Sequence, residues 1–164
     1  MNAADIVTAL SLVPHPEGGH YREIGRSTDR VARAALGDRH AGDRPLYTSI
    51  YYLLRDGEKS RFHRLRSDEL WCLVSGGSLL LHRLERDGQL KTVRLGLALD
   101  RGEHPYAIVP RGTWFGAHLQ AEALYALATC TVIPGFDFAD FELGDRSSLL
   151  AAHPAHRKII ELLT

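Results

Sequence analysis

The sequence predicts a single domain of the all-β class, folded as a barrel or sandwich of short strands. From residue 45 onward, short runs rich in β-branched, aromatic and aliphatic residues follow one another, and a turn closes each run. Asp87-Gly88, between two such runs, is typical of a tight β-hairpin. The 164 residues suffice for one domain with a hydrophobic core and are short for two. We therefore predict one domain over residues 1–164.

The N-terminal part precedes these strands and differs from them in character. Apolar residues recur at helical spacing over residues 3–12, which predicts a short helix, and Pro14 and Pro16 end it. Residues 15–23 form an unusual turn that leads into a strand. Residues 26–44 are charged and without periodicity, so we expect a long surface loop there, the least ordered part of the chain.

Seven β-rich runs then follow, and the C-terminal tail returns to helical spacing. The runs cover residues 47–54, 70–74, 78–84, 90–95, 106–109, 114–119 and 124–132. In the tail, residues 154–163 have the apolar spacing of a helix. Many short strands with turns between them are typical of a sandwich or barrel rather than of alternating strands and helices.

Composition excludes several classes of partner. Lys and Arg number 20, as do Asp and Glu, so the zero net charge gives no basic excess for nucleic acid. No apolar run approaches the roughly 20 residues of a membrane span, and the N-terminus lacks the features of a signal peptide. Cys72 and Cys130 are expected to be reduced thiols. These observations predict a cytoplasmic protein without nucleic-acid or membrane partners.

The most informative stretch is residues 57–76. They have the order Gly-x5-His-x-Leu-x3-Glu-x6-Gly, with His63, Leu65 and Glu69 at the three inner positions. This order resembles the first motif of the cupin superfamily, in which a second histidine stands where Leu65 stands here. Every spacing of that motif matches, so we interpret residues 57–76 as a modified first cupin motif.

A second motif of the same superfamily is matched more loosely. Residues 104–118 resemble it at Pro110 and Gly112 alone. Phe115 occupies the position of the motif's histidine, and His104 stands where its first glycine is expected. The chain therefore resembles a cupin whose usual metal site has lost two of its three histidines.

A narrower resemblance covers nearly the whole chain. It rests on the segments HPEGG-x-YRE (15–23), SIYYLL (49–54), FHR and SDE-x-W (62–71), VP-x-G-x-W (109–114) and CTV-x-PGF-x-F-x-x-FE (130–142). In this order they resemble an uncharacterised cupin family, the domain of unknown function 985 (Cupin-5). The resemblance implies a double-stranded β-helix, or jelly-roll barrel, with a short N-terminal and a C-terminal helix, commonly as a homodimer. His20 replaces a frequent aromatic residue, and Cys72 replaces a histidine.

The spacing within the first motif also limits the chemistry. Residues two apart on a strand share a face, so His63 and Leu65 point into the barrel, with Glu69 arriving from the next strand. One imidazole and one carboxylate make a weak metal site, because catalytic zinc uses about three protein ligands. We therefore favour no cofactor. The alternative is a divalent transition metal on His63 and Glu69, completed by one of three candidates: Cys72, His104 or His118.

His63 and Glu69 are the candidate catalytic residues. The ordinary pKa of histidine lies near neutrality, so His63 is suited to act as a general base that Glu69 orients. Candidate ligand-binding residues come from the turn, the strands and the two motifs: Glu17, Tyr21, Tyr52, Arg61, Trp71 and Phe115.

Three functions remain open from the sequence. The leading hypothesis is a protein that binds a small polar metabolite in the barrel and performs metal-free acid–base catalysis, isomerase- or epimerase-like, on a sugar derivative. An enzyme with this barrel is expected to be isomerase- or epimerase-like, or lyase-like. Similar barrels include sugar-nucleotide 3,5-epimerases, which use a histidine base without metal. The alternatives are a metal-dependent cupin enzyme with a non-standard ligand set and a non-catalytic small-molecule-binding protein.

Overall fold

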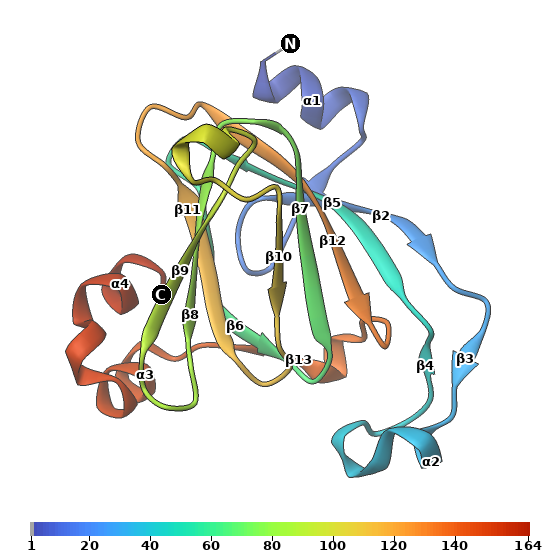
Figure 1. Ribbon diagram of the computed structural model, residues 1–164. Helices are drawn as coiled ribbons and strands as arrows, with labels where there is room; N and C mark the ends of the chain where they lie inside the picture. Colours follow the sequence, from blue (N-terminus) through green and yellow to red (C-terminus); the bar gives the residue numbers. More distant parts are fainter. Residues whose placement is uncertain (1) are drawn as a thin grey trace.

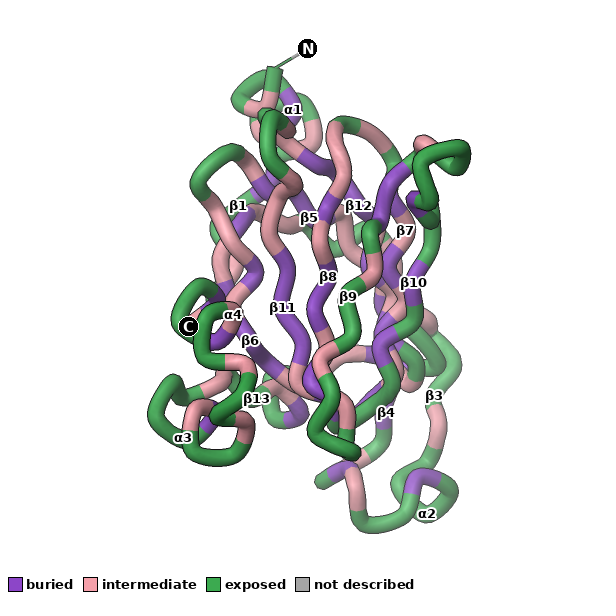
Figure 2. Tube along the Cα trace, turned by 60° about the vertical axis from the view of Figure 1, so that its left-hand side comes forward, coloured by how far each residue is buried: buried purple, intermediate pink, exposed green. Residues whose placement is uncertain are grey.

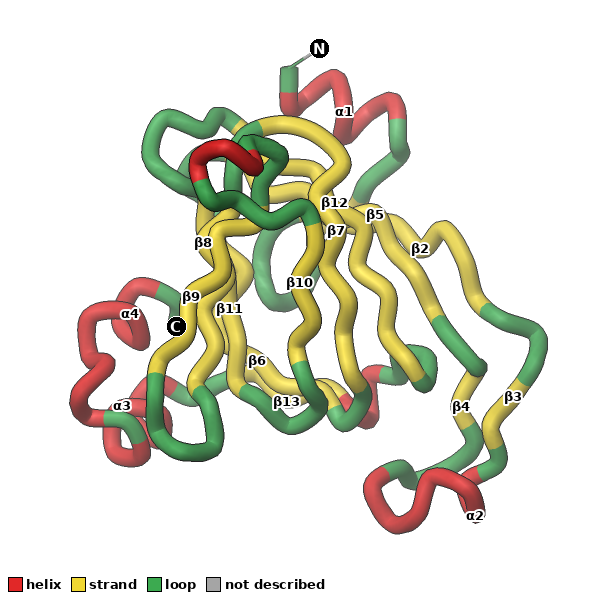
Figure 3. Tube along the Cα trace, in the orientation of Figure 1, coloured by secondary structure: helices red, strands yellow, loops and turns green. Residues whose placement is uncertain are grey.

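The computed structural model describes residues 2–164, and its strands form two facing sheets (Figures 1 and 3). The strands are β1 (Val13–Pro14), β2 (His20–Arg26), β3 (Arg30–Val31), β4 (Arg44–Pro45), β5 (Thr48–Arg55), β6 (Lys59–Leu65), β7 (Asp68–Gly76), β8 (Leu79–Leu84), β9 (Leu90–Leu95), β10 (Tyr106–Val109), β11 (Trp114–Leu119), β12 (Tyr125–Ile133) and β13 (Phe141–Leu143). The helices are α1 (Ala3–Ala9), α2 (Arg33–Leu36), α3 (Arg146–Ala152) and α4 (Arg157–Leu162).

The two main sheets have the jelly-roll arrangement that the sequence predicts. One has the strand order β1-β2-β5-β12-β7-β10 and the other β13-β6-β11-β8-β9, with antiparallel neighbours throughout. The predicted Asp87-Gly88 hairpin joins β8 to β9. Gly88 there has φ +82°, a conformation that favours glycine.

The core lies between the sheets because each strand alternates buried and outward side chains. On β7, Glu69, Trp71 and Leu73 are buried, whereas Cys72 and Val74 face outward. Figure 2 shows buried residues in the middle of β8 and β11 as well. A polar residue at an inward position of β7 therefore reaches the interior of the barrel.

The predicted terminal helices are present and cover the outside of the barrel. An Asn2–Asp5 capping box begins α1, which packs on the outer faces of β5 and β12 at one end of the barrel. α3 and α4 lie against the other sheet (Figure 1), where Leu149 and Ile160 join Phe62 in a buried cluster. Among residues 2–164, no helix is long and apolar enough to span a bilayer.

Residues 26–44 differ from the expected featureless surface loop. The segment includes β3 and α2, and β3 pairs with β4 to form a small ladder. Two buried side chains tether it to Asp140: Arg44 donates from Nε at 2.6 Å, and His40 Nδ1 lies at 2.9 Å. Hydrophobic periodicity cannot predict these contacts with Asp140, because they are polar and join residues that are far apart in the sequence.

Candidate functional site

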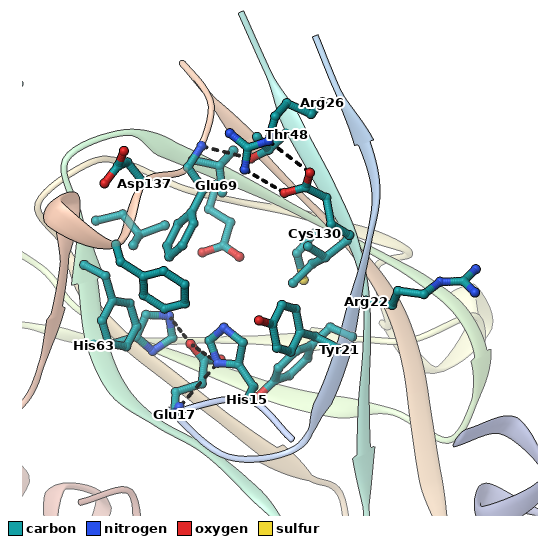
Figure 4. A pocket seen from close by; sticks show the side chains of 18 of the residues that line it. His15, Glu17, Tyr21, Arg22, Arg26, Thr48, His63, Glu69, Cys130 and Asp137 are labelled. Atoms are coloured by element: carbon teal, nitrogen blue, oxygen red, sulfur yellow. Dashed lines mark hydrogen bonds and ion pairs between the residues drawn. The ribbon is translucent and has the colours of Figure 1, made fainter. Parts of the chain in front are cut away.

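A cavity of about 450 Å³ opens between the two sheets. Both sheets, the chain before β2 and the segment after β12 contribute to its walls. Its lining comprises Ser11, Val13, His15, Glu17, Tyr21, Arg22, Glu23, Arg26, Thr48, Ile50, Tyr52, His63, Leu65, Glu69, Trp71, Cys130, Val132, Phe136, Asp137, Phe138 and Phe141. About half of these residues are aromatic or aliphatic, and the others are polar or charged (Figure 4).

Glu17 reaches the cavity on the tight turn between β1 and β2. Gly18 and Gly19 follow it with φ of +114° and +68°. A Cβ on Gly18 would lie 2.0 Å from the Lys59 carbonyl oxygen, so only glycine fits there. The Tyr52 hydroxyl donates to the Gly18 carbonyl at 2.8 Å and holds the turn against the barrel. These contacts leave Glu17 only 4% exposed.

Glu17 and His63 form a buried acid–base pair. His63 Nε2 lies 3.1 Å from Glu17 Oε2, and the Ser60 hydroxyl donates to Glu17 Oε1 at 2.7 Å. His63 Nδ1 lies 2.7 Å from the Arg61 carbonyl oxygen. Because a carbonyl oxygen only accepts, Nδ1 carries the ring hydrogen, and Nε2 is the ring nitrogen that faces the Glu17 carboxyl.

His15 is a third member of this cluster, and sequence reasoning missed it as a site residue. Its Nδ1 accepts from the Glu17 backbone N–H at 3.3 Å and lies 3.5 Å from Glu17 Oε2. Burial lowers the pKa of His15, His63 lowers it further, and Glu17 offsets part of the change. His15 therefore stays uncharged near neutral pH, and its ring packs edge-on against Tyr21. The available sequence signal was its position in the HPEGG segment.

Glu69 forms a separate polar group on the opposite sheet. Figure 4 shows its carboxyl projecting into the open centre of the cavity, across from the His15–Glu17–His63 cluster. It is only 6% exposed, and its Oε2 has no hydrogen-bond partner. Burial raises the pKa of Glu69 well above its usual range, and the charge of Glu17 adds to the rise. Burial therefore favours the protonated, uncharged form of Glu69.

Most of the residues predicted from the sequence meet in this cavity. They are Glu17, Tyr21, Tyr52, His63, Glu69 and Trp71. Arg61 does not line it, because its guanidinium donates to the carbonyls of Pro16 and Glu17 and secures the turn instead. Phe115 lies behind the His63 ring, with the two ring centroids 4.0 Å apart, and supports that ring rather than facing the cavity.

The expected pairing of His63 with Glu69 is wrong. His63 is on β6 and Glu69 is on β7, which belong to different sheets, and no ion pair joins them. The partner of His63 is Glu17. The sequence motif places both residues inside the barrel but does not determine which carboxyl approaches the imidazole.

The residues of this site do not fit the metal that the first cupin motif implies. The Arg61 carbonyl occupies His63 Nδ1, which leaves Nε2 with Glu17 as two donor groups, fewer than the roughly three protein ligands of a catalytic metal site. The three proposed additional ligands are also elsewhere: Cys72 is on the outward side of β7, His104 is exposed, and His118 contacts His82. Within residues 2–164, no group of three or more His, Cys, Asp or Glu side chains is arranged to hold a metal ion.

A comparison with protein families identifies the family of the chain. Residues 4–144 match the sequence profile of the family described as "Cupin superfamily (DUF985)". The chain belongs to this family. A curated relative is the uncharacterized protein YML079W of Saccharomyces cerevisiae, 29% identical over 145 residues, which cover 82% of this chain and 71% of the yeast protein.

The chain also resembles solved structures of other proteins. A hypothetical protein from Leishmania major has a TM-score of 0.92 and 34% identity over 100% of this chain and 99% of its own. Protein SO0799 from Shewanella oneidensis has a TM-score of 0.90 and 40% identity over 100% and 98%. Oxalate decarboxylase from Bacillus subtilis is 16% identical with a TM-score of 0.56, over 92% of this chain and 36% of that enzyme, and shares the fold alone.

Proposed function

We propose that this cupin binds a small polar molecule in its barrel and moves a proton to and from a carbon of that molecule, as an isomerase or epimerase does. The observation that carries the proposal is the contact between His63 Nε2 and Glu17 Oε2 at 3.1 Å on the cavity wall. A general base must lie within reach of the proton that it removes, and this pair borders the ligand space directly.

The surroundings of the pair support a base rather than a purely structural contact. The Arg61 carbonyl fixes the orientation and tautomer of the His63 ring, and Ser60 fixes the other oxygen of Glu17. The ring also lies between Phe115 and Phe141, which limits its rotation. A positioned imidazole beside a carboxylate is poised to accept a proton and return it, because the carboxylate stabilises the imidazolium that forms.

Exchange of carbon-bound hydrogen with solvent tests the proposal. Wild-type protein is incubated in D₂O with a panel of aldoses, ketoses, lactones and sugar phosphates, and deuterium incorporation is read by mass spectrometry. We expect incorporation into at least one compound. His63→Gln should reduce the rate by about 100-fold or more. The control variant His104→Gln alters an exposed histidine outside the cavity and should exchange at the wild-type rate.

Two outcomes would overturn the assignment of His63 as the base. One is the absence of exchange with every compound of the panel. The other is exchange in the His63→Gln variant at the wild-type rate.

The proposal includes a homodimer, formed along the outer faces of β7 and β10. Four large apolar side chains are exposed on these two strands and on β12, which pairs with β7 in the same sheet: Val74, Tyr106, Ile108 and Ile133. They share one face according to the register, because Tyr106 and Ile108 pair with the outward Cys72 and Leu70. A second copy of the chain would remove this apolar strip from water.

A further inference from the structure

The wall of the cavity that carries Glu69 has two buried polar atoms without hydrogen-bond partners. They are Glu69 Oε2 and Trp71 Nε1. The residues are two apart on β7, so their side chains leave the same face of the strand, and both line the cavity. Buried donors and acceptors are almost always paired in folded proteins, so two neighbouring unpaired ones that face a cavity indicate a ligand atom.

Both groups are hydrogen-bond donors at neutral pH. The Trp71 indole N–H can only donate. The Glu69 carboxyl donates through its O–H because burial, with the charge of Glu17 added, raises its pKa well above the usual range. The nearby Cys130 thiol and Trp71 indole offset only part of that rise. The ligand atom that meets them is therefore an acceptor, such as a carbonyl oxygen.

The charges around the cavity exclude an anionic ligand from its interior. The Arg26 guanidinium is occupied by Glu23, with donor–acceptor distances of 2.9 and 2.7 Å. Arg22 is exposed and points away from the open centre (Figure 4). Both arginines line the cavity, but one is paired and the other is turned outward, so an anion at the centre would lie beside the Glu17 carboxylate with neither guanidinium directed at it.

We propose that Glu69 and Trp71 bind the carbonyl oxygen of an uncharged ligand, and that the carbon next to this carbonyl faces His63 and Glu17. The inference rests on the proposed function and narrows its substrate to neutral carbonyl compounds. Sugar phosphates and sugar nucleotides are excluded by their charge.

The resulting step is balanced without a further reactant. The His63–Glu17 pair takes the proton from the carbon next to the carbonyl, and the C–H electrons form a C=C bond. The carbonyl π electrons move to the oxygen, where the negative charge develops against the donors of Glu69 and Trp71. Return of a proton from the pair to the same carbon re-forms the carbonyl, and in D₂O it leaves deuterium at that carbon.

The Trp71 indole N–H reports on this binding directly. Cyclohexanone is the neutral probe and cyclohexanecarboxylate the matched anion, and each is titrated into ¹⁵N-labelled protein while the indole signals are followed by NMR. Trp114 serves as an internal control, because it lies outside the cavity with the Arg64 guanidinium 4.5 Å from its ring centroid. We expect cyclohexanone to move the Trp71 signal downfield, to leave Trp114 unchanged, and to bind at least about tenfold more tightly than the anion.

Two substitutions of Glu69 separate donation from charge. Glu69→Gln keeps an uncharged donor and should bind cyclohexanone within about threefold of wild type. Glu69→Leu removes the donor at similar volume and should weaken binding about tenfold. Tighter binding of cyclohexanecarboxylate, an unmoved Trp71 signal, or undiminished binding by Glu69→Leu would each overturn the inference.

The same samples in D₂O keep this inference distinct from the proposed function. Cyclohexanone that moves the Trp71 signal but gains no deuterium next to its carbonyl supports the carbonyl site and counts against proton transfer. Deuterium exchange that depends on His63 while the Trp71 signal stays still supports proton transfer and overturns the carbonyl site.

Discussion

Replacing Glu69 by glutamine should stabilise the protein, and the gain should grow with pH. Wild-type Glu69 is buried and protonated in the folded state, whereas the unfolded chain releases its proton above the ordinary value of 4.5. The folded pKa is raised, so the contribution of Glu69 to stability is fully present below 4.5 and is lost as pH rises toward the folded pKa. Glu69→Gln has no proton to lose and escapes this penalty.

The magnitude follows from one proton. Above pH 5 to 6 the folded state holds one more proton at Glu69 than the unfolded state, which costs about 1.4 kcal/mol in the free energy of unfolding for each pH unit. The advantage of Glu69→Gln over wild type should therefore increase by about 1.4 kcal/mol for each pH unit above this range, as long as folded Glu69 keeps its proton. The difference should level off at the pH where folded Glu69 ionises.

Urea unfolding followed by circular dichroism, at half-unit intervals from pH 5 to 8, measures this difference. Glu122→Gln is the matched control, because Glu122 is exposed and has no ion pair. Its stability should run parallel to that of wild type across the pH range. Parallel curves for Glu69→Gln and wild type would refute the reasoning, since they would mean that Glu69 releases its proton at an ordinary pH in the folded protein.

Three further predictions follow from other parts of the structure. Burial and the neighbouring His118 lower the pKa of His82 to about 4. Its ring should therefore titrate near pH 4 by NMR, and the protein should lose stability as the pH falls below 6.5. An NMR titration midpoint near pH 6.5 would contradict this prediction. Asp140→Asn leaves the buried Arg44 without its countercharge and should cost about 3 kcal/mol in urea unfolding, with faster proteolysis of residues 26–44; unchanged stability would argue against the anchor. Light scattering after size exclusion should give a dimer of the 18.2 kDa chain, and a monomer would contradict the proposed interface.

Much of the fold was readable from the sequence because its signals are local. The predicted runs 90–95, 106–109 and 114–119 coincide with β9, β10 and β11. Their turns carry Gly or Pro, and hydrophobic alternation fixes which side chains enter the core. The short strand β13 was missed, since its three residues give too short a pattern to show a period.

The site was predictable as a set of residues but not as a set of contacts. Spacing placed His63 and Glu69 inside the barrel, and both line the cavity. The choice of Glu17 over Glu69 as the partner of His63 depends on how the turn before β2 folds against the barrel. Hydrophobic periodicity does not predict this contact, because the contact joins the irregular turn before β2 to the distant strand β6. The same limit applied to His15.

The glycine turn before β2 has a consequence for how such a protein can diverge. The imidazole of the pair is on strand β6 of a main sheet. Its carboxylate is on the short connection between β1 and β2, which is not part of a paired strand. Substitution of Glu17 alone, with the two glycines after it kept, can thus replace the acid or remove it while the strand pairing stays intact. Descendants of one barrel can change reactivity at this one position, so neighbours that share the strands need not share a reaction.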